Sequence, residues 1–403
     1  MNAPKLRFAR FNEPWECRAI RDIGTVITGS TPPRCDSSCW GGEFNWISSK
    51  DFKSKYIFDS DEKITDKGKK HCRLLPAGSV LVTCIGASIG LKAIAKKPCA
   101  TNQQINAVIC RACDNEYLYY LMGFLKAQLR RCAGQTALPI ISKGVFESFE
   151  GNFSCVDEQT AISGVLSSFD SLIDAEELRL ESLRKLKSAC MAKMFAGVGE
   201  TCPKMRLKGY SGDWIEKRLC DLVNRVDRKN VNMEASIPLT ISAQDGLIAQ
   251  EQFFDKRIAS KNLCGYYLIR KGEFAYNRSS SQGYPFGSVK RLEKYDNGAL
   301  SALYTVFSLH DMISSDFMKA YFDTDKWHGE VRFRACEGAR NHGLLNISAD
   351  DFFQLELRIP PTIEEQNAIG EFMTNLDISI RLQGDRVEKM RHLKSACMER
   401  MFV

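Results

Sequence analysis

Leu186-Lys187-Ser188-Ala189-Cys190-Met191 occurs twice in this chain, because residues 393–398 repeat the same six residues in the same order. The match extends in both directions, so that 158–195 aligns with 365–402 without a gap at a constant spacing of 207 residues. This repeat is much longer than the roughly 20 to 50 residues of a solenoid unit. The chain is therefore a tandem of two large units, each a lobe followed by a long helix.

A weaker repeat, with a spacing of 199 residues, opens each half of the chain and pairs Arg7 with Arg206. The repeats predict the boundaries of five segments. We expect a lobe over 1–153, a helix over 154–197, a linker over 198–206, a second lobe over 207–361 and a second helix over 362–403. Gly197 and Gly199 end the first helix, and Thr362 with Glu365 forms a capping box at the start of the second. Ser154 with Asp157 is a looser version of that box.

The composition is that of an ordinary globular protein. The chain has 403 residues, of which 44% are hydrophobic and 26% charged. No apolar run approaches the ~18 residues of a membrane span, and the first residues lack the apolar core of a signal peptide. We therefore expect a cytoplasmic protein that does not bind membranes, with enough residues for two hydrophobic cores.

The 16 cysteines are scattered, and in a reducing compartment they are expected to be small buried thiols. The pairs Cys35/Cys39 and Cys110/Cys113 lack a second pair at zinc-finger spacing, so no metal site is predicted. The net charge is +7. The two repeated helices are close to neutral, so the positive excess lies in the lobes and linkers, where a polyanion could be bound.

Both repeated segments carry an apolar stripe at spacings of three and four residues, which is typical of a coiled-coil seam. In the first segment the seam comprises Ile162, Leu166, Phe169, Ile173, Leu180 and Leu183, and in the second Ile369, Met373, Leu376, Ile380, Val387 and Met390. Each helix would be roughly 57 Å long. Since a lobe separates them in sequence, we expect them to pair as an antiparallel coiled coil within one chain. The alternative is that each helix packs on its own lobe.

Each lobe is predicted to be mixed α/β, with short strands and long turns. The first lobe contains Thr28-Gly29-Ser30-Thr31-Pro32, then Trp40-Gly41-Gly42, and the strand entry Leu75-Pro76-Ala77-Gly78-Ser79-Val80-Leu81. Gly134-Gln135-Thr136 and the Glu-Gln-x-Ala-Ile helix start follow. With these motifs and the duplicated order of lobe and helix, the chain resembles the specificity subunit of type I restriction-modification systems. The second lobe matches more loosely, because it lacks the Thr-Gly-Ser-Thr-Pro turn.

The resemblance implies a non-catalytic subunit whose lobes are target-recognition domains, each reading one half of an asymmetric, bipartite target in double-stranded DNA. It also implies two methyltransferase subunits, which bring S-adenosylmethionine and methylate one adenine in each half-site after flipping it from the stack. Restriction subunits that use ATP and Mg would join them. No cofactor is expected on this chain itself.

Candidate DNA contacts follow from side-chain chemistry, because base edges are read by Arg, Asn, Gln or His and phosphates are gripped by cations. Candidates for base reading from loops are Gln135 and Thr136 in the first lobe, and Arg332, Arg334, Arg340, Asn341 and His342 in the second. Phosphate candidates are Lys67, Lys69, Lys70 and Arg73, with Arg278, Lys290 and Arg291. For any one of them, a solvated surface charge is an equally good explanation. Trp40, Trp46 and Tyr284 are interpreted as packing aromatics.

No catalytic motif is found in the sequence. The nearest approach to the adenine-methyltransferase tetrad, Ile359-Pro360-Pro361-Thr362, has the wrong residues at both ends. Gly86 and Gly90 lack the spacing of a dinucleotide or phosphate loop. The alternatives from other classes are a duplicated nuclease or methyltransferase with diverged motifs, and a coiled-coil scaffold that binds only protein. The sequence does not give the target bases, the spacer length or the oligomeric state.

Overall fold

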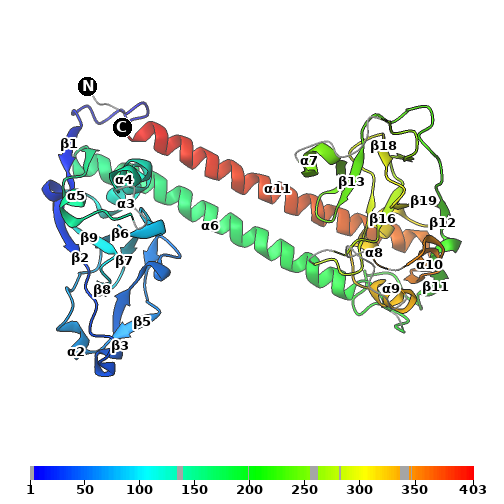
Figure 1. Cartoon of the computed structure of the whole chain (residues 1–403), viewed down its shortest axis with the longest axis horizontal. Helices are drawn as coiled ribbons and strands as arrows, with labels where there is room; N and C mark the ends of the chain where they lie inside the picture. The colour runs from blue at the N-terminus through cyan, green and yellow to red at the C-terminus, as the bar shows by residue number, and fades with distance from the viewer. Residues whose placement is uncertain are drawn as a thin grey trace. The chain divides into compact units, whose positions relative to one another are not determined.

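The computed structural model describes residues 4–133, 139–197, 199–254, 262–280, 283–335, 345 and 347–403. The chain divides into two compact units. Unit 1 combines Met1–Glu177 with Asp385–Val403, and unit 2 is Leu178–Gly384. The division falls within the two long helices, α6 (Val156–Lys193) and α11 (Ile363–Met401), so each unit contains one lobe and part of both helices (Figure 1).

The first lobe consists of short strands and helices. Its strands are β1 (Glu16–Ala19), β2 (Gly24–Thr28), β3 (Trp40–Ile47), β4 (Tyr56–Ile57), β5 (Glu62–Ile64), β6 (Val80–Thr83), β7 (Lys92–Ala95), β8 (Cys99–Thr101), β9 (Ile105–Cys110) and β10 (Glu150–Phe153). Its helices are α1 (Ile20–Ile23), α2 (Asp66–Lys69), α3 (Asn115–Phe124), α4 (Lys126–Cys132) and α5 (Lys143–Glu147). The main sheet has the order β2-β9-β6-β7-β4, and β5-β3-β8 and β1-β10 form smaller sheets. Strand β6 is central and buried along its whole length, which suits its β-branched and aliphatic residues.

The second lobe has the same general composition. Its strands are β11 (Ile215–Arg218), β12 (Val223–Arg225), β13 (Leu239–Ser242), β14 (Gly246–Ala249), β15 (Tyr267–Arg270), β16 (Phe274–Asn277), β17 (Ser288–Arg291), β18 (Asn297–Leu300), β19 (Thr305–Leu309) and β20 (Glu356–Ile359). Its helices are α7 (Gln250–Phe254), α8 (Ser315–Phe322), α9 (His328–Arg334) and α10 (Ala349–Phe353). The main sheet has the order β12-β19-β16-β17, and β11-β20, β13-β14 and β15-β18 form pairs.

The two lobes share a topology that their sequences barely show. The strand order β2-β9-β6-β7 in the first lobe corresponds to β12-β19-β16-β17 in the second, and the pair β1-β10 corresponds to β11-β20. The prediction that both lobes are mixed α/β is confirmed. They differ outside this shared framework, where the first lobe has a three-stranded sheet and the second has two separate strand pairs.

Each lobe core is completed by pieces of both long helices. In unit 1, Ile162 and Leu166 from the start of α6 and Phe402 at the end of α11 belong to the core around α3. In unit 2, Ile369 from the start of α11 and Phe195 at the end of α6 belong to the core around α8. In each unit, therefore, the long helix that follows the lobe begins in the lobe core, and the other long helix ends in the same core.

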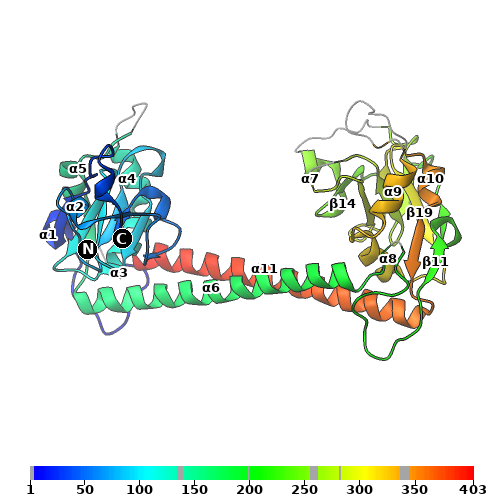
Figure 2. The same cartoon turned by 90° about the horizontal axis from the view of Figure 1, so that it is seen from below.

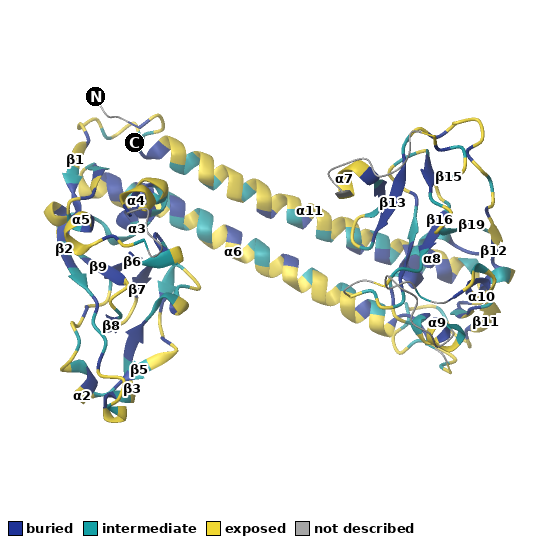
Figure 3. Cartoon of the chain, viewed as in Figure 1, coloured by how far each residue is buried: buried dark blue, intermediate teal, exposed yellow. Residues whose placement is uncertain are grey.

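The other predicted seam residues lie between these core contacts. Ile173 and Leu180 on α6, and Met373, Leu376 and Val387 on α11, are buried, while the remaining four are half-buried. Figure 3 shows buried residues recurring along both helices with exposed residues between them, and within each unit the two helices run side by side in both views (Figure 2). The apolar residues at the ends of the stripe thus pack in the lobe cores. The alternative interpretation expected such packing on a lobe along the whole of each helix.

The starts of the long helices differ from the predicted capping boxes. The Glu365 N–H donates to Thr362 Oγ1 at 3.4 Å, as a cap requires. The Glu365 carboxylate, however, accepts hydrogen bonds from Nε and Nη2 of Arg206 at 2.7 and 2.8 Å. The Ser154 hydroxyl donates to the Cys155 carbonyl. The prediction of a reciprocal box was wrong, because a charged partner distant in sequence binds the glutamate more strongly than a backbone N–H does.

Candidate nucleic-acid interface

The Thr28–Pro32 turn of the first lobe is held tightly by its surroundings. Gly29 packs so closely that an added Cβ would lie 2.1 Å from the Asn102 carbonyl oxygen, so only glycine fits. Arg73, a predicted phosphate contact, donates from Nη1 to the Thr28 carbonyl at 2.6 Å, and its N–H donates to Ser30 Oγ. The guanidinium of Arg73 therefore fastens this turn from the outside.

The three lysines near α2 differ in how far their charges are neutralised. Lys67 forms an ion pair with Asp36 at 2.7 Å, and this contact raises the pKa of Lys67. Lys69 pairs with Asp66 at 2.8 Å. Lys70 is exposed and makes no ion pair with any residue that the structure describes. Of the three, Lys70 is the most available to a phosphate.

In the second lobe, two of the predicted phosphate contacts are engaged internally. Lys290 on β17 pairs with Asp323 at 2.6 Å. Arg291 is only 15% exposed and pairs with Glu293 and Asp316 at 2.7 and 2.8 Å. These ion pairs tie β17 to α8 and the turn after it, so both cations have a structural role in the isolated chain.

Arg332 and Arg334, predicted to lie in a loop, are in helix α9. Arg334 pairs with Glu330 at 3.3 Å, whereas Arg332 is exposed with its guanidinium 5.3 Å from the centroid of the Phe286 ring. Phe333 between them is 83% exposed. The sequence interpretation missed this ring, although an aromatic residue between two arginines is the pattern used to stack on bases.

Five predicted base contacts, Gln135, Thr136, Arg340, Asn341 and His342, lie outside the described residues. The flanks of these segments are described. In the first lobe, Gly86 N–H donates to the Pro139 carbonyl at 2.8 Å, within the connection between β6 and β7. In the second, Leu345 N–H donates to the Arg278 carbonyl at 3.0 Å, within the connection between β16 and β17. The described flanks of the two segments, Pro139 and Leu345, therefore contact corresponding connections in the shared topology.

The aromatic side chains assigned to packing have different roles. The Trp40 and Trp46 rings meet edge to face at 5.0 Å, and both indole N–H groups donate to backbone carbonyls, as expected of packing residues. Tyr284 instead lines a hollow of about 500 Å³ in the second lobe. The sequence alone did not distinguish these environments.

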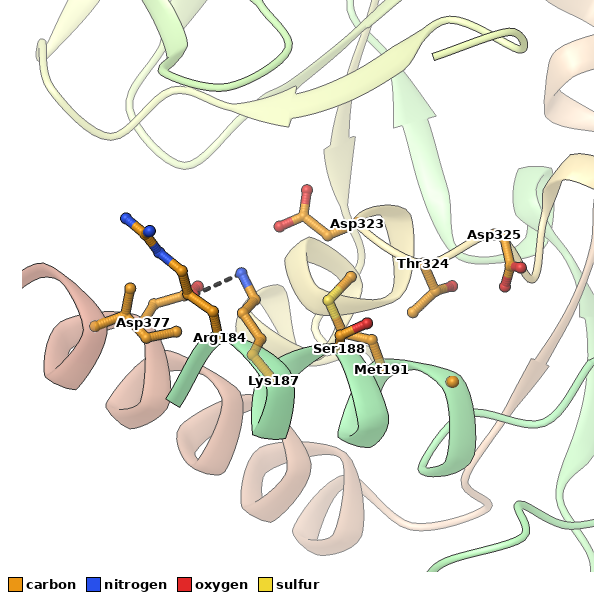
Figure 4. Close-up of a pocket in the computed structure, with 10 residues that line it drawn as sticks. Arg184, Lys187, Ser188, Met191, Asp323, Thr324, Asp325 and Asp377 are labelled. Atoms are coloured by element: carbon orange, nitrogen blue, oxygen red, sulfur yellow. Dashed lines mark ion pairs between the residues drawn. The ribbon is translucent and has the colours of Figure 1, made fainter. Parts of the chain in front are cut away.

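The long helices carry matching interhelical ion pairs. In unit 2, Lys187 of α6 pairs with Asp377 of α11 at 2.6 Å, beside a cavity of about 450 Å³ that Arg184 also lines (Figure 4). In unit 1, Lys394 of α11 pairs with Asp170 of α6. The second pair is the first shifted by the repeat spacing of 207 residues, with the helices exchanged.

The described residues lack both a metal-binding cluster and a membrane-spanning helix. They contain no cluster of three or more His, Cys, Asp or Glu side chains arranged to hold a metal ion. None of the helices in that same part of the chain combines the length and apolar character needed to cross a bilayer.

Comparison with known proteins identifies a domain in the first half of the chain. Residues 12–185 match the family model of the type I restriction modification DNA specificity domain. The chain is also 36% identical over 180 residues to the MjaIX specificity subunit of Methanocaldococcus jannaschii, a match that covers 43% of this chain and 41% of the relative. Residues 12–185 therefore carry a type I restriction modification DNA specificity domain. A second relative, the HindI specificity subunit of Haemophilus influenzae, is 29% identical over 34% of this chain and 31% of its own length. The matched region thus spans less than half the length of each of these relatives.

Solved structures of the specificity family share the fold along the entire chain. The S subunit from M. genitalium superposes with a TM-score of 0.61 at 14% identity, covering 100% of this chain and 99% of that one. A structure titled for complex assembly and conformational transition of the type I R-M system gives a TM-score of 0.57 at 12% identity, with 97% and 98% coverage. At such identities the likeness concerns the fold, which includes the second lobe that the family model does not reach.

Proposed function

We propose that this chain is the DNA-specificity subunit of a type I restriction-modification complex and has no catalytic activity of its own. The first lobe, 1–153, and the second, 207–361, are target-recognition domains. Each reads one half of an asymmetric bipartite site in double-stranded DNA. The helices set the distance between the half-sites.

One observation carries the proposal: the contacts that attach each lobe to its helix are duplicated, while the lobe surfaces are not. Arg7 binds Glu158 as Arg206 binds Glu365. Next to each glutamate, a glutamine side chain accepts from the N-cap residue of a lobe helix, with Gln159 bound by the N–H of Asp114 and Gln366 by that of Ser314, both at 2.9 Å. A constant framework with two different outer surfaces is what reading two different half-sites requires.

The helices would form the antiparallel coiled coil that acts as a ruler. An antiparallel pair brings the start of one helix to the end of the other, and duplication then generates contacts that recur with the helices exchanged. Lys187–Asp377 and Lys394–Asp170 have this relation. Glu177–Arg391, at 2.6 Å, adds an ion pair in unit 1. This ion pair is not repeated in unit 2, because the position equivalent to Glu177 there is Gly384.

The partners would be two methyltransferase subunits that carry S-adenosylmethionine, joined by restriction subunits that use ATP and Mg. Two identical surfaces suit two identical partners. Leu186 and Leu393 are each 48% exposed, and Ala189 and Ala396, one turn further on, are also exposed. Within the chain these side chains have no packing role, so their identity in the two repeats points to a common partner that binds both.

The proposed DNA contacts of each lobe are predicted residues that form no ion pair within the described part of the chain. Lys70 and Arg332 are exposed cations suited to phosphates, and the segments holding Gln135 and Arg340 are suited to base readout. Lys290 and Arg291 would contact DNA only by exchanging their carboxylate partners for phosphates, which lowers their expected contribution.

The test is a lobe exchange in the assembled methyltransferase. The chain is co-expressed with its methyltransferase partner, and methylated adenines in the host DNA are mapped by single-molecule sequencing. Replacing 1–153 by the corresponding lobe of a relative should change one half of the methylated site and leave the other half and the spacer unchanged. The reciprocal exchange of 207–361 is the matched control. Alteration of both halves by one exchange contradicts the model, as does methylation by the purified chain alone.

A further inference from the structure

The hollow of about 500 Å³ in the second lobe is lined by four stretches of sequence, 240–245, 253, 277–288 and 304. The turn of the β13–β14 hairpin supplies Gln244, the end of β16 supplies Asn277, and the connection to β17 supplies Tyr284. Tyr304, just before β19, and Phe253 on α7 complete the aromatic part of the wall. Two amides and three rings thus line one concave surface.

The polar groups of this wall are partly satisfied and partly free. The Thr240 and Tyr304 hydroxyls lie 3.1 Å apart and bind each other, and Asn277 Oδ1 accepts from the Ser279 N–H at 3.0 Å. In contrast, the Gln244 amide, the Nδ2 group of Asn277 and the Tyr284 hydroxyl have no hydrogen-bond partner among the residues that the structure describes. The hollow therefore offers amide and hydroxyl groups to a ligand.

The charge of the hollow argues against phosphate. Its lining contains one ionisable carboxylate, Asp245, which binds the Ser242 hydroxyl at 2.8 Å, and no lysine or arginine. The cations on the adjoining strand, Lys290 and Arg291, are neutralised by carboxylates. A flat, neutral, aromatic group with hydrogen-bonding edges suits these walls, and a nucleobase has those properties.

The position of the hollow links it to DNA. Arg278 lies between the lining residues Asn277 and Ser279, and its carbonyl accepts from Leu345, which follows the predicted base-reading segment around Arg340. The hollow therefore adjoins Leu345, the described residue that follows the segment in which base contacts are expected. Because it is concave, it can admit a single ring that has left the stack, whereas the base edges of an intact duplex do not enter such a space.

We propose that this hollow binds one nucleobase of the second half-site, turned out of the duplex, and that it contributes to sequence discrimination there. Gln244 and Asn277 bind the edge of the base, and Tyr284 stacks on its face. The inference rests on the proposed function of the second lobe and adds a second site of base extrusion, distinct from the methylated adenine.

Mismatched duplexes test the proposal, because a base that must leave the stack does so more easily from a mismatch. The chain assembled with its methyltransferase is titrated against duplexes carrying one mismatch at each position of the mapped second half-site. At one position other than the methylated adenine, a mismatch should tighten binding by about fivefold or more. The increase at the adenine itself serves as an internal control for extrusion by the methyltransferase.

Variants assign that increase to the hollow. The double variant Gln244→Ala/Asn277→Ala and the single variant Tyr284→Ala should lose the increase at the second position and keep it at the adenine. Gln252→Ala, at an exposed glutamine outside the lining, should behave like the wild type. All variants must assemble with the methyltransferase and methylate the first half-site.

Three outcomes would overturn the proposal. In one, mismatches tighten binding only at the methylated adenine; in another, the hollow variants leave the second increase intact. Equal competition by free nucleosides, without any position effect in the duplex, would make the hollow a site for a soluble ligand and would also overturn it. In each case site-specific methylation by the wild type would still support the proposed function, whereas its absence would refute that function first.

Discussion

Arg7 reaches across 151 residues of sequence to bind Glu158, with Nε and Nη2 donating to the two carboxylate oxygens at 2.8 and 2.9 Å. The Glu158 side chain is 1% exposed, and its counterpart Glu365, bound by Arg206, is 2% exposed. Each lobe is thus attached to the start of its helix by a carboxylate that has been removed from water. A buried carboxylate of this kind depends on its partner.

Replacing Arg206 by Met should therefore destabilise unit 2 strongly. The substitution leaves Glu365 buried without its cation, which costs about 3 to 5 kcal/mol. The double variant Arg206→Met/Glu365→Leu should recover much of the loss, because no charge then remains buried. Urea unfolding of the wild type and both variants measures the difference. A single variant that costs less than about 1 kcal/mol would mean that the pair behaves like an exposed one.

An acidic residue in the helix seam should block assembly. Ile173→Asp or Ile380→Asp places an unpaired charge between the helices, at a cost of several kcal/mol. Co-purification with the methyltransferase subunit, followed by light scattering, reports the result. Leu172→Asp is the matched control, since Leu172 precedes Ile173 and is 51% exposed. Equal behaviour of all three variants would contradict the pairing of the helices.

Lys70→Ala should weaken binding to every DNA sequence alike. The loss of one phosphate contact reduces the slope of log K against log salt by about one unit. Binding titrations at several salt concentrations measure this slope. Asp36→Ala is an informative comparison, because it releases Lys67 from its ion pair and should increase the slope. An unchanged slope in Lys70→Ala would leave Lys70 as a solvated surface charge.

Arg340→Ala should relax discrimination at a single base pair of the second half-site. A bidentate arginine–guanine contact contributes about 1 to 3 kcal/mol of discrimination. Binding of the assembled methyltransferase to a panel of singly substituted duplexes gives the profile. Uniform weakening across the panel would make Arg340 a phosphate contact, and no change would make it a surface residue without a role in DNA binding.

Lys92 should make the stability of unit 1 dependent on pH. Burial, and next the nearby charge of Lys394, lower the pKa of Lys92 to about 7. Between pH 7 and the ordinary lysine pKa, the unfolded chain binds more protons than the folded one, so this group makes stability rise with pH. Lys92→Met should therefore be more stable than the wild type at pH 6.5, and its advantage should shrink toward pH 8.5 in thermal unfolding. Lys97→Met, at an exposed position, should show no such trend.

The sequence predicted what repeats and periodicity encode. The duplication, the two long helices and the mixed α/β lobes follow from patterns within a few dozen residues. The partner of the Glu365 side chain could not be predicted from such patterns. The nearby Thr362 suggested a local cap, whereas the actual partner, Arg206, lies 159 residues away. Likewise, Gln244 and Asn277 meet only after two strand pairs have formed. Contacts between segments that are distant in sequence leave no local pattern.

Phe402 has a consequence for the order in which the chain acquires its structure during synthesis. Its ring lies 5.2 Å from Tyr117 and 5.5 Å from Phe124, in the core of the first lobe. Unit 2 is one continuous stretch, but unit 1 needs Asp385–Val403 as well as the first 177 residues. The lobe that leaves the ribosome first is therefore completed last. Until then its incomplete core exposes apolar surface, which makes the nascent chain prone to aggregation.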